Sequence, residues 1–316
     1  MAEIVTLGET MASFSPSSPG PLRYMRSFES RTAGAESNLA VGVSKLGHSA
    51  SWISALGEDE FGHFIENSIR SEGVDTSLVR YDPEHKTGLM FKQVKAAGET
   101  SVFYYRENSA ASHMPKDIAP VSAIQSASIF HTTGITPILG ESCREAVYAC
   151  VFAAQKHGTL FSFDPNIRKK LWKNRDYTHL ITDLIFQADI VLLGLSEAKM
   201  LFSSTEIPRL ADNLFTNGKA KYIAVKDGKN GAIVMDQNQI IPISPHPCCC
   251  IDPIGAGDAF NSAFLCGILE SRTLSECGLM GAAAGALATE TYGDTEGYPT
   301  CAVMNSILNN KSDIFR

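Results

Sequence analysis

The stretch Asp252-Pro253-Ile254-Gly255-Ala256-Gly257-Asp258-Ala259-Phe260 is followed by small and apolar residues at helical spacing through Leu269. Small residues that open a helix leave backbone N–H groups unpaired and sterically accessible, and these groups point together at the helix N-terminus. The positive end of the helix dipole favours the charge of a phosphoryl group at that place. The stretch therefore predicts an anion hole, without a lysine, made by Gly255, Ala256 and Gly257.

Asp258 lies in the first turn of this predicted helix, beside the proposed phosphate site. Its carboxylate could accept the proton of an attacking hydroxyl group, which is the role of a general base in phosphoryl transfer. The alternative is structural, because an aspartate in a first helical turn also complements the helix dipole. The motif alone leaves both interpretations open, and the rest of the chain favours catalysis.

The rest of the sequence predicts an α/β fold. From about residue 34 onward, short β-rich segments alternate with segments of helical periodicity, which is typical of a mostly parallel sheet with helices on both faces. We expect helices after Gly34 and after Asp59, ending near Gly47 and Gly73. The expected strands span residues 3–8, 51–55, 128–131, 160–163, 190–193 and 222–225, with antiparallel edge strands in 227–243.

Two segments, 11–33 and 86–106, interrupt this alternation. In the second one, β-rich runs at 88–94 and 100–105 flank turn residues at 97–99, which predicts a hairpin in an antiparallel sheet separate from the main one. We expect this small sheet to form a lid inserted into a single α/β domain made of residues 1–10, 34–85 and 107–316. A lid above the carboxyl ends of the strands would exclude water from a transfer reaction.

Polar residues follow two of the predicted strands. Asp164-Pro165-Asn166-Ile167-Arg168 would place Asp164, Asn166 and Arg168 on one side of a crevice, although Asp-Pro-Asn is also a good turn sequence. Glu197, after the strand at 190–193, could hold a magnesium-bound water, or it could be an ordinary first-turn acid.

Two further groups suit a hydroxylated or acidic ligand. Gly34, Ala35 and Asn38 form a small-residue turn that would permit close approach, or simply a tight turn from strand to helix. Tyr104 and Arg106 share a face of the predicted lid strand. An arginine that points into a closed site suggests a substrate with a carboxylate or polarised carbonyl, while a solvated strand-end arginine is the alternative.

The composition excludes some partners and compartments. Among 316 residues, 27 Lys and Arg stand against 34 Asp and Glu, a net charge of −7, and no cationic stripe favours nucleic acid or an anionic membrane. No apolar run reaches the roughly 18 residues of a membrane span, so we expect a cytoplasmic protein. The eight cysteines lack CxxC spacing and are expected to be mostly buried free thiols; the run Cys248-Cys249-Cys250 has no functional explanation. We expect His131 to be a hydrogen-bonded core residue.

These residues together resemble the ribokinase-like (PfkB) carbohydrate kinases along essentially the whole chain. The early turn from Gly34 to Asn38 and the late Gly255-Ala256-Gly257-Asp258 carry the resemblance. Within that family the chain looks most like the 2-keto-3-deoxygluconate kinases. The matching segments are 33–38, 87–89, 104–106 with 109–112, 133–137, 164–168 and 293–297. The chain departs from common patterns of the wider family at Glu9, Gly194 and Pro253.

The resemblance implies a three-layer α/β/α domain with a β lid, often paired lid to lid in a homodimer, and it implies ATP and Mg²⁺ as cofactors. Asp258 would be the base and residues 255–257 the anion hole. The residues implied to contact a sugar acid are Gly34, Asn38, Tyr104, Arg106, Ile135, Arg168 and Asp294. Those implied for the nucleotide are Lys226, Gly228, Gly231, Ala283 and Ala286, with Gly255 and Gly257, while Glu197 would order Mg²⁺ through water.

The activity implied is transfer of the γ-phosphoryl group of ATP to the 6-hydroxyl of 2-keto-3-deoxygluconate, with Arg106 and Arg168 holding the acid end. One alternative is a kinase of the same fold that acts on a neutral sugar such as fructose or on another keto-deoxy sugar acid. Another is a nucleotide or sugar-acid sensor without catalysis, against which the intact Gly255–Asp258 motif argues.

Overall fold

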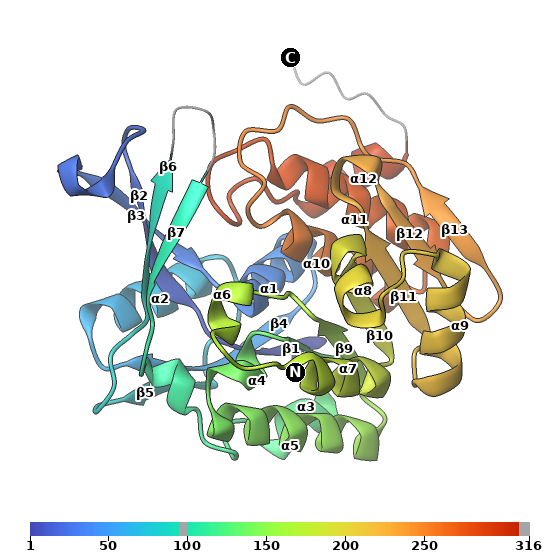
Figure 1. Ribbon diagram of the computed structural model, residues 1–316, viewed down its shortest axis with the longest axis horizontal. Coiled ribbons are helices and arrows are strands. Elements are labelled where there is room, and N and C mark those ends of the chain that lie inside the picture. The colour runs from blue at the N-terminus through green and yellow to red at the C-terminus, as the bar shows by residue number, and fades with distance from the viewer. Residues whose placement is uncertain (95–99, 310–316) are drawn as a thin grey trace.

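The computed structural model describes residues 1–94 and 100–309. Within these ranges, a sheet of nine strands forms the centre of the molecule and a sheet of four strands lies at one side of it (Figure 1). The order of the large sheet is β13-β12-β11-β10-β9-β8-β1-β4-β5. Its strands are β1 (Ile4–Leu7), β4 (Ala50–Gly57), β5 (Val79–Asp82), β8 (Ile129–Thr133), β9 (Leu160–Asp164), β10 (Ile190–Gly194), β11 (Tyr222–Lys226), β12 (Ala232–Met235) and β13 (Ile240–Ile243).

The large sheet is parallel from β5 to β11, and β12 and β13 are antiparallel at its edge. Every residue of β1, β4 and β8 is buried, because helices cover both faces and leave no polar side to the strands. Each strand expected from the sequence overlaps an observed strand. The predicted mostly parallel α/β fold is confirmed.

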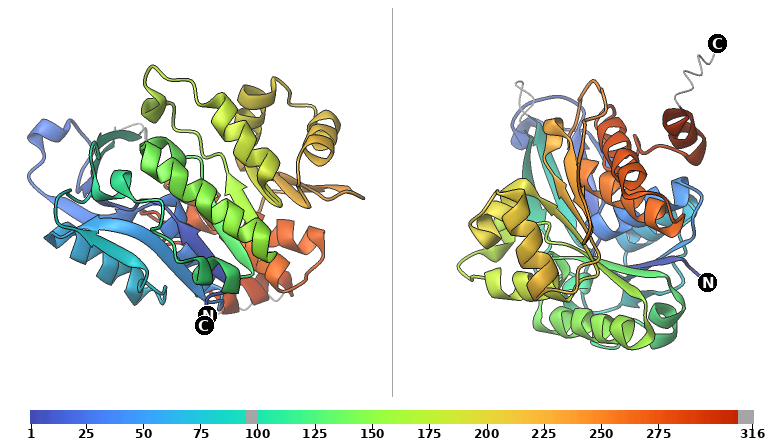
Figure 2. Two further views of the ribbon diagram at one scale, coloured as in Figure 1. Left: turned by 90° about the horizontal axis from the view of Figure 1, so that it is seen from below. Right: turned by 90° about the vertical axis from the view of Figure 1, so that its right-hand side faces the viewer.

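Helices on both faces of the large sheet give three layers (Figure 2). One hydrophobic cluster joins the sheet to helices from the middle of the chain, and a second joins it to helices nearer the two ends. The first group is α3 (Val121–Ser126), α4 (Thr136–Leu139), α5 (Glu141–His157), α6 (Lys169–Trp172), α7 (Thr178–Gln187), α8 (Leu195–Phe202) and α9 (Ile207–Asn217). The second group is α1 (Ala35–Lys45), α2 (Glu60–Ser71), α10 (Ala256–Leu269), α11 (Leu274–Ala288) and α12 (Cys301–Leu308).

The ends of the first two helices follow the expected signals. Asp59 caps α2, because its Oδ1 accepts a hydrogen bond from the amide of Gly62 at 2.9 Å. Gly47 and Gly73 follow α1 and α2 with φ angles of +91° and +86°, a region that favours glycine.

The small sheet, which we call the lid sheet, has the order β3-β2-β6-β7. Its strands are β2 (Met11–Pro16), β3 (Phe28–Ala33), β6 (Leu89–Val94) and β7 (Thr100–Tyr105), all within the segments 11–33 and 86–106. β6 and β7 are antiparallel as predicted, whereas the turn predicted at 97–99 lies outside the described residues. The expectation of a wholly antiparallel sheet was wrong, because β2 pairs with β6 in parallel. β2 and β6 follow β1 and β5, which run the same way in the large sheet, so both strands enter the lid in one direction.

Among the described residues, no helix is both long and apolar enough to cross a membrane. All eight cysteines are free, as expected, but only half of them are buried: Cys248, Cys249, Cys250 and Cys301 are exposed. The expectation of mostly buried thiols was therefore wrong for the loop before α10. His131 is buried and its Nδ1 lies 3.0 Å from Ser162 Oγ, which confirms the predicted hydrogen-bonded core position.

Candidate active site

A cavity of about 180 Å³ lies between the lid sheet and the N-terminus of α10. Its lining includes all seven residues expected to contact a sugar acid, together with Asp258 and Gly255. These nine residues come from the β3–α1 junction, β7 and its end, the segments after β8 and β9, the tip of α10 and the loop after α11. The structure thus brings together residues that are up to 260 positions apart, Gly34 and Asp294 being the outermost.

Asp258 is 9% exposed, and its Oδ2 accepts a hydrogen bond from Asn38 Nδ2 at 2.9 Å. Burial raises the pKa of Asp258 to about 7, and the negative charge of Asp164 acts in the same direction. The Asn38 hydrogen bond and the charges of Arg168 and Lys226 lower the pKa but do not offset burial. A carboxylate with a pKa near neutrality can take up a proton from an alcohol in the transition state and release it afterwards.

The tip of α10 has the geometry of an anion hole. Gly255 has a φ of +81°, and a Cβ there would lie 2.0 Å from the carbonyl oxygen of Asp294, so this position requires glycine. Gly257 is exposed, and a Cβ there would meet only Lys226 Nζ, at 3.8 Å. The first hydrogen bond of the helix runs from the Ala259 amide to Gly255 O at 2.9 Å. Within the described part of the chain, the amides of residues 256–258 have no partner and are free for an anion.

A network beneath this tip ties α10 to the sheet. Lys226 Nζ donates to Asp164 Oδ2 at 2.7 Å and to Asn261 Oδ1 at 3.0 Å, and Asn261 Nδ2 donates to Asp164 Oδ2 at 2.6 Å. These three side chains come from β11, β9 and α10. Lys226 therefore lies under the predicted anion hole. Asp164 is 2% exposed, so its carboxylate interacts with this network and is less accessible to a ligand in the crevice than we expected. Asn261 was not among the predicted site residues, although its position three residues after Asp258 puts both on one helix face.

The two arginines expected to hold an acid differ in their surroundings. Arg106 is 8% exposed and forms an ion pair with Glu9, which also accepts a hydrogen bond from Ser109 Oγ at 2.6 Å. The charge of Arg106 is therefore already neutralised by a buried carboxylate, whereas we expected Arg106 to bind the substrate. Arg168 lines the same cavity, is exposed, and has no ion-pair partner among the described residues. Arg168 is thus the cation that remains available to an anionic ligand.

Asp294 is linked to the lid. Lys92, in β6, donates to Asp294 Oδ1 at 2.9 Å, and both side chains are at most 7% exposed. Lys92 was not among the predicted site residues. The alternation of the strand carried the signal, because Lys92 falls two residues after Met90, which lines the cavity.

The residues expected to bind a nucleotide are only partly suited to it. Gly228 has a φ of +52° and open space where a Cβ would stand, whereas a Cβ at Gly231 would lie 2.1 Å from the Ile243 carbonyl oxygen. Gly231 is therefore required by its packing on β13. Ala283 is 1% exposed and packed in the core, whereas Ala286, three residues later, is half-buried and more accessible to a nucleotide.

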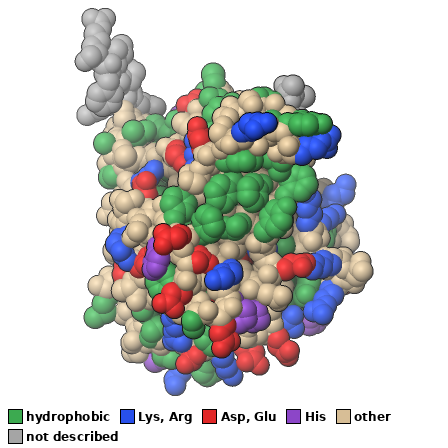
Figure 3. Space-filling view, turned by 90° about the vertical axis from the view of Figure 1, so that its left-hand side faces the viewer, with side chains coloured by type: hydrophobic (Ala, Val, Ile, Leu, Met, Phe, Trp, Pro, Cys, Tyr) green, Lys and Arg blue, Asp and Glu red, His purple; other side chains and the backbone are tan. Residues whose placement is uncertain are grey.

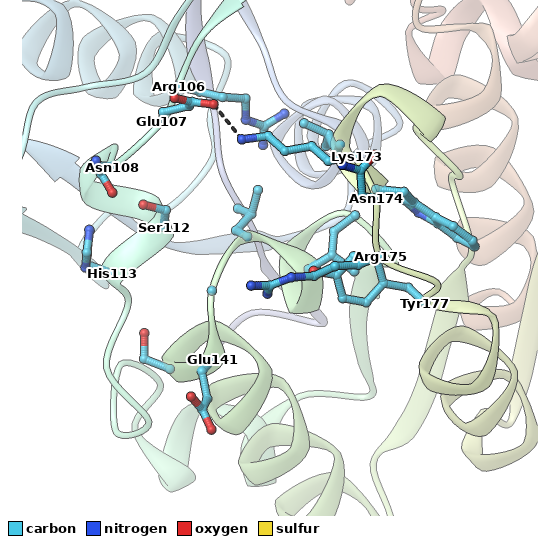
Figure 4. Close-up of a pocket in the computed structure, with 16 residues that line it drawn as sticks. Arg106, Glu107, Asn108, Ser112, His113, Glu141, Lys173, Asn174, Arg175 and Tyr177 are labelled. Atoms are coloured by element: carbon cyan, nitrogen blue, oxygen red, sulfur yellow. Dashed lines mark hydrogen bonds and ion pairs between the residues drawn. The ribbon is translucent and has the colours of Figure 1, made fainter.

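A second and larger cavity, of about 760 Å³, is also lined by Arg106 (Figure 4). Figure 4 shows Glu107 paired with Lys173 across its upper rim, at 2.6 Å. Arg175 points into the space between this pair and Glu141. None of the residues at the tip of α10 lines this cavity, so the chemistry expected of Asp258 belongs to the smaller one.

The sequence profile of the pfkB family of carbohydrate kinases matches residues 1–301. The chain belongs to this family. It is 34% identical to a 2-dehydro-3-deoxygluconokinase of Bacillus subtilis (97% of this chain, 95% of the relative) and 33% identical to a 2-dehydro-3-deoxygalactonokinase of Haloferax volcanii (93% and 92%). A PfkB protein from Polaromonas sp. JS666 has a similar crystal structure, with a TM-score of 0.89 at 32% identity (97% and 100%). An uncharacterized sugar kinase from Pyrococcus horikoshii, in complex with ATP, has a TM-score of 0.83 at 28% identity (95% and 96%).

A carbohydrate kinase of this family uses ATP, which raises the question of which side chains could assist a magnesium ion. Both carboxylate oxygens of Glu197 accept backbone amides at 2.7 Å, from Ile167 and Gly194, and burial with the nearby charge of Asp164 raises the pKa of Glu197. The described residues contain no group of three or more acidic, histidine or cysteine side chains arranged to hold a metal. Mg²⁺ commonly binds through substrate phosphates, water and few protein ligands. A magnesium ion that is bound by the phosphates would need few protein ligands, and Glu197 would hold it through water.

Proposed function

We propose that this carbohydrate kinase transfers the γ-phosphoryl group of ATP to the 6-hydroxyl of 2-keto-3-deoxygluconate (2-dehydro-3-deoxygluconate). The observation that carries the proposal is the cavity itself: a carboxylate with a pKa of about 7, unpaired helix amides and an arginine without an ion-pair partner line or adjoin one space of about 180 Å³. A base and an anion hole suit phosphoryl transfer to an alcohol, and the free arginine suits an acceptor with a carboxylate. The 34% identical relative named as a 2-dehydro-3-deoxygluconokinase supports the choice of acceptor.

In this mechanism Asp258 accepts the proton of the 6-hydroxyl as its oxygen attacks the γ-phosphorus. The free amides of residues 256–258 donate to the phosphoryl oxygens, where negative charge is spread in the transition state. Lys226 holds these amides in place through Asp164 and Asn261. A magnesium ion, when bound, would neutralise phosphate charge, with Glu197 orienting one of its waters. Asn38, Tyr104 and Ile135 would surround the sugar, and the lid would exclude water.

The nucleotide is proposed to lie along the open side of α10, near Gly228, Gly257 and Ala286. Lys226 contributes there through its charge under the anion hole rather than by contact with the base. Such a position puts the γ-phosphoryl group between the helix tip and the sugar cavity, which in-line transfer requires.

The acceptor is tested by a panel of sugars and sugar acids in a coupled ATP-consumption assay. The panel contains 2-keto-3-deoxygluconate, its galactonate epimer, a 5-keto-2-deoxy sugar acid and fructose. The epimer belongs in it because a 33% identical relative is named a 2-dehydro-3-deoxygalactonokinase. We expect the highest kcat/KM with 2-keto-3-deoxygluconate; a preference for fructose would refute the proposed acceptor while leaving the kinase assignment intact.

Variants then test the roles of the residues. Asp258→Asn should lower kcat at least about a hundredfold, because removal of a general base costs about 10²–10⁴-fold, and near-normal turnover would refute its role. Arg168→Ala should raise KM for the acid about tenfold or more and leave that for a neutral sugar nearly unchanged. Lys169→Ala is the matched control, since Lys169 is a neighbouring cation that lines an adjacent groove but not the sugar cavity. Arg106→Ala should impair both substrates, because it leaves Glu9 buried without its counter-ion.

We also propose a homodimer formed through the outer face of the lid sheet. An aromatic cluster covers this face, in which Phe91 packs against Phe14, Phe28 and Tyr105. Phe103 and Tyr105 are 45% and 65% exposed there, and Figure 3 shows a hydrophobic patch on this side of the molecule. Light scattering of wild type and of Phe103→Glu measures the mass; a monomeric wild type would refute the dimer. The proposed location is the cytoplasm, where free thiols such as the eight here persist.

A further inference from the structure

Lys92 is a lysine on the inner face of the lid sheet and is only 4% exposed. Phe91, its neighbour in β6, packs in the aromatic cluster on the opposite face. Within the described residues, the Lys92 ammonium has one hydrogen-bond acceptor, Asp294 Oδ1. A buried ammonium needs such a partner. Because Lys92 is on β6 and Asp294 is on the loop after α11, the contact requires β6 to lie against that loop.

The contact continues from Asp294 to the proposed base. Asp294 Oδ2 accepts a hydrogen bond from Asn38 Nδ2 at 3.4 Å, and the same nitrogen donates to Asp258 Oδ2 at 2.9 Å. An amide NH₂ has two hydrogens, so one is directed to each carboxylate. Lys92, Asp294, Asn38 and Asp258 therefore form a continuous chain of hydrogen bonds from the lid to the tip of α10.

The backbone of Asp294 is in contact with the other half of the site. Its carbonyl oxygen would lie 2.0 Å from a Cβ on Gly255, so Asp294 packs directly against the first residue of the anion hole. A shift of the Asp294 side chain or loop would consequently be felt at the base and at the hole together.

We propose that Lys92 is a positioning residue that links lid closure to the base: in the closed lid its ammonium neutralises Asp294 and so keeps Asp258 ionised beside the acceptor hydroxyl. The inference rests on the proposed role of Asp258 as the base. Without this ammonium, the negative charge of Asp294, which is held by the same Asn38 amide, disfavours ionisation of Asp258 in the closed site.

The charged groups around Asp258 come from several elements of the fold. The groups that face it or line its cavity are Asp164 on β9, Arg168 after β9, Lys226 on β11, Tyr298 and Asp294 beyond α11, Lys92 on β6, Arg106 at the end of β7, Glu36 on α1 and Glu9 after β1. The ion pairs of Lys226 with Asp164 and of Arg106 with Glu9 do not involve the lid strand β6. Lys92 is thus the cation of this set whose partner directly shares a donor with Asp258.

The experiment is the pH dependence of kcat and kcat/KM for wild type, Lys92→Met and Lys92→Arg, with whichever acceptor of the panel the wild type phosphorylates. The matched control is Arg31→Met. Arg31, on β3, pairs with Glu296 at 3.2 Å, so it also joins the lid to the loop of residues 293–297 but has no link to Asn38. Removing a unit charge a short distance from a carboxyl shifts its pKa by about one to two units at an effective dielectric constant of about 20.

We expect Lys92→Met to move the acid limb of both profiles upward by about one pH unit or more, and Lys92→Arg to restore it. Arg31→Met should raise KM with the acid limb in its wild-type place. If Lys92→Met and Arg31→Met lower kcat/KM alike with unchanged acid limbs, Lys92 is only a lid contact and the inference is refuted. Lys92→Gln carries the same expectation if the methionine variant does not fold. Failure of the proposed base would appear separately, as Asp258→Asn with near-normal turnover.

Discussion

The perturbed carboxyl of Asp258 predicts that its removal stabilises the protein at high pH. Burial raises the pKa of Asp258 from an ordinary value of 3.8 to about 7. Below pH 3.8 the folded and unfolded chains are both protonated at this residue, and it has no effect on the free energy of unfolding. As the pH rises further, the unfolded chain loses the proton first, so the folded state is progressively destabilised until the pH exceeds 7.

The magnitude follows from the width of this window. A difference of about 3 pH units corresponds to about 4 kcal/mol at pH values above 7, and to about 2 kcal/mol at about pH 5. Asp258→Asn removes the titration while the introduced carbonyl can still accept from Asn38. The free energy of unfolding of the variant, relative to wild type, should therefore increase by about 2–3 kcal/mol between about pH 5 and about pH 8. For a chain of this length that is a relative gain in Tm of about 4 °C.

Thermal and urea unfolding of both proteins at the two pH values measures this difference, and the comparison across pH cancels any cost of the amide that is independent of pH. Asp176→Asn serves as a control. The Thr178 hydroxyl and amide lower the pKa of Asp176 below its ordinary value, so its contribution is complete at both pH values and its variant should show no change between them. A difference for Asp258→Asn that stays constant or shrinks as the pH rises would refute the raised pKa, and with it the reason to regard this carboxyl as a base near neutrality.

Two further predictions separate folding from phosphate binding at the tip of α10. Gly257→Ala should leave Tm nearly unchanged, because the added Cβ meets only Lys226 Nζ at 3.8 Å, but it should raise KM for ATP or lower kcat about tenfold or more. Gly255→Ala should lower the free energy of unfolding by about 3 kcal/mol or more, because its Cβ would lie 2.0 Å from the Asp294 carbonyl oxygen at a φ of +81°. Similar Tm losses in the two variants would contradict the assignment. Lys226→Met should cost about 3–5 kcal/mol by leaving Asp164 buried without its counter-ion, and should move the acid limb of the pH–rate profile upward because a cation that lowers the pKa of Asp258 is removed. Urea unfolding and the pH–rate profile measure both effects, and an unchanged unfolding midpoint would contradict the first.

The parts of the fold that local chemistry specifies were predictable from the sequence. The cap at Asp59, the glycines after α1 and α2 and the apolar strands of the large sheet each depend on residues close together in the chain. The direction of β2 relative to β6 was not predictable in this way. It depends on where β1 and β5 lie in the large sheet, which is information that neither segment contains.

The candidate site divides along the same line. The local geometry of Gly255 to Asp258 depends on one helix turn, and the sequence alone predicted that turn. The partners did not show in the sequence, because Lys92, Glu9 and Asn261 are paired with residues far from them in the chain. Arg106 illustrates the consequence: its position on the inner face was predictable from strand alternation, but its ion pair with Glu9 was not. Ala283 shows the converse, since a small residue in a helix fits an open nucleotide site and a tight core equally well.

The pairing of charges also explains why Asp258, among five carboxyl groups in or beside the cavity, is suited to proton transfer. Glu9 is paired with Arg106, Asp294 with Lys92 and Asp164 with Lys226, so each of these three carboxylates already has a cation as its partner. Glu36 has a raised pKa, but its Oε1 already accepts the Thr133 amide and the hydroxyls of Thr133 and Thr136. Asp258 has no ion-pair partner among the described residues, accepts one side-chain amide, and adjoins the free amides of α10. Among these five, Asp258 is thus the carboxyl group that has neither an ion-pair partner nor several hydrogen-bond donors of its own, as the proposed role of a base requires.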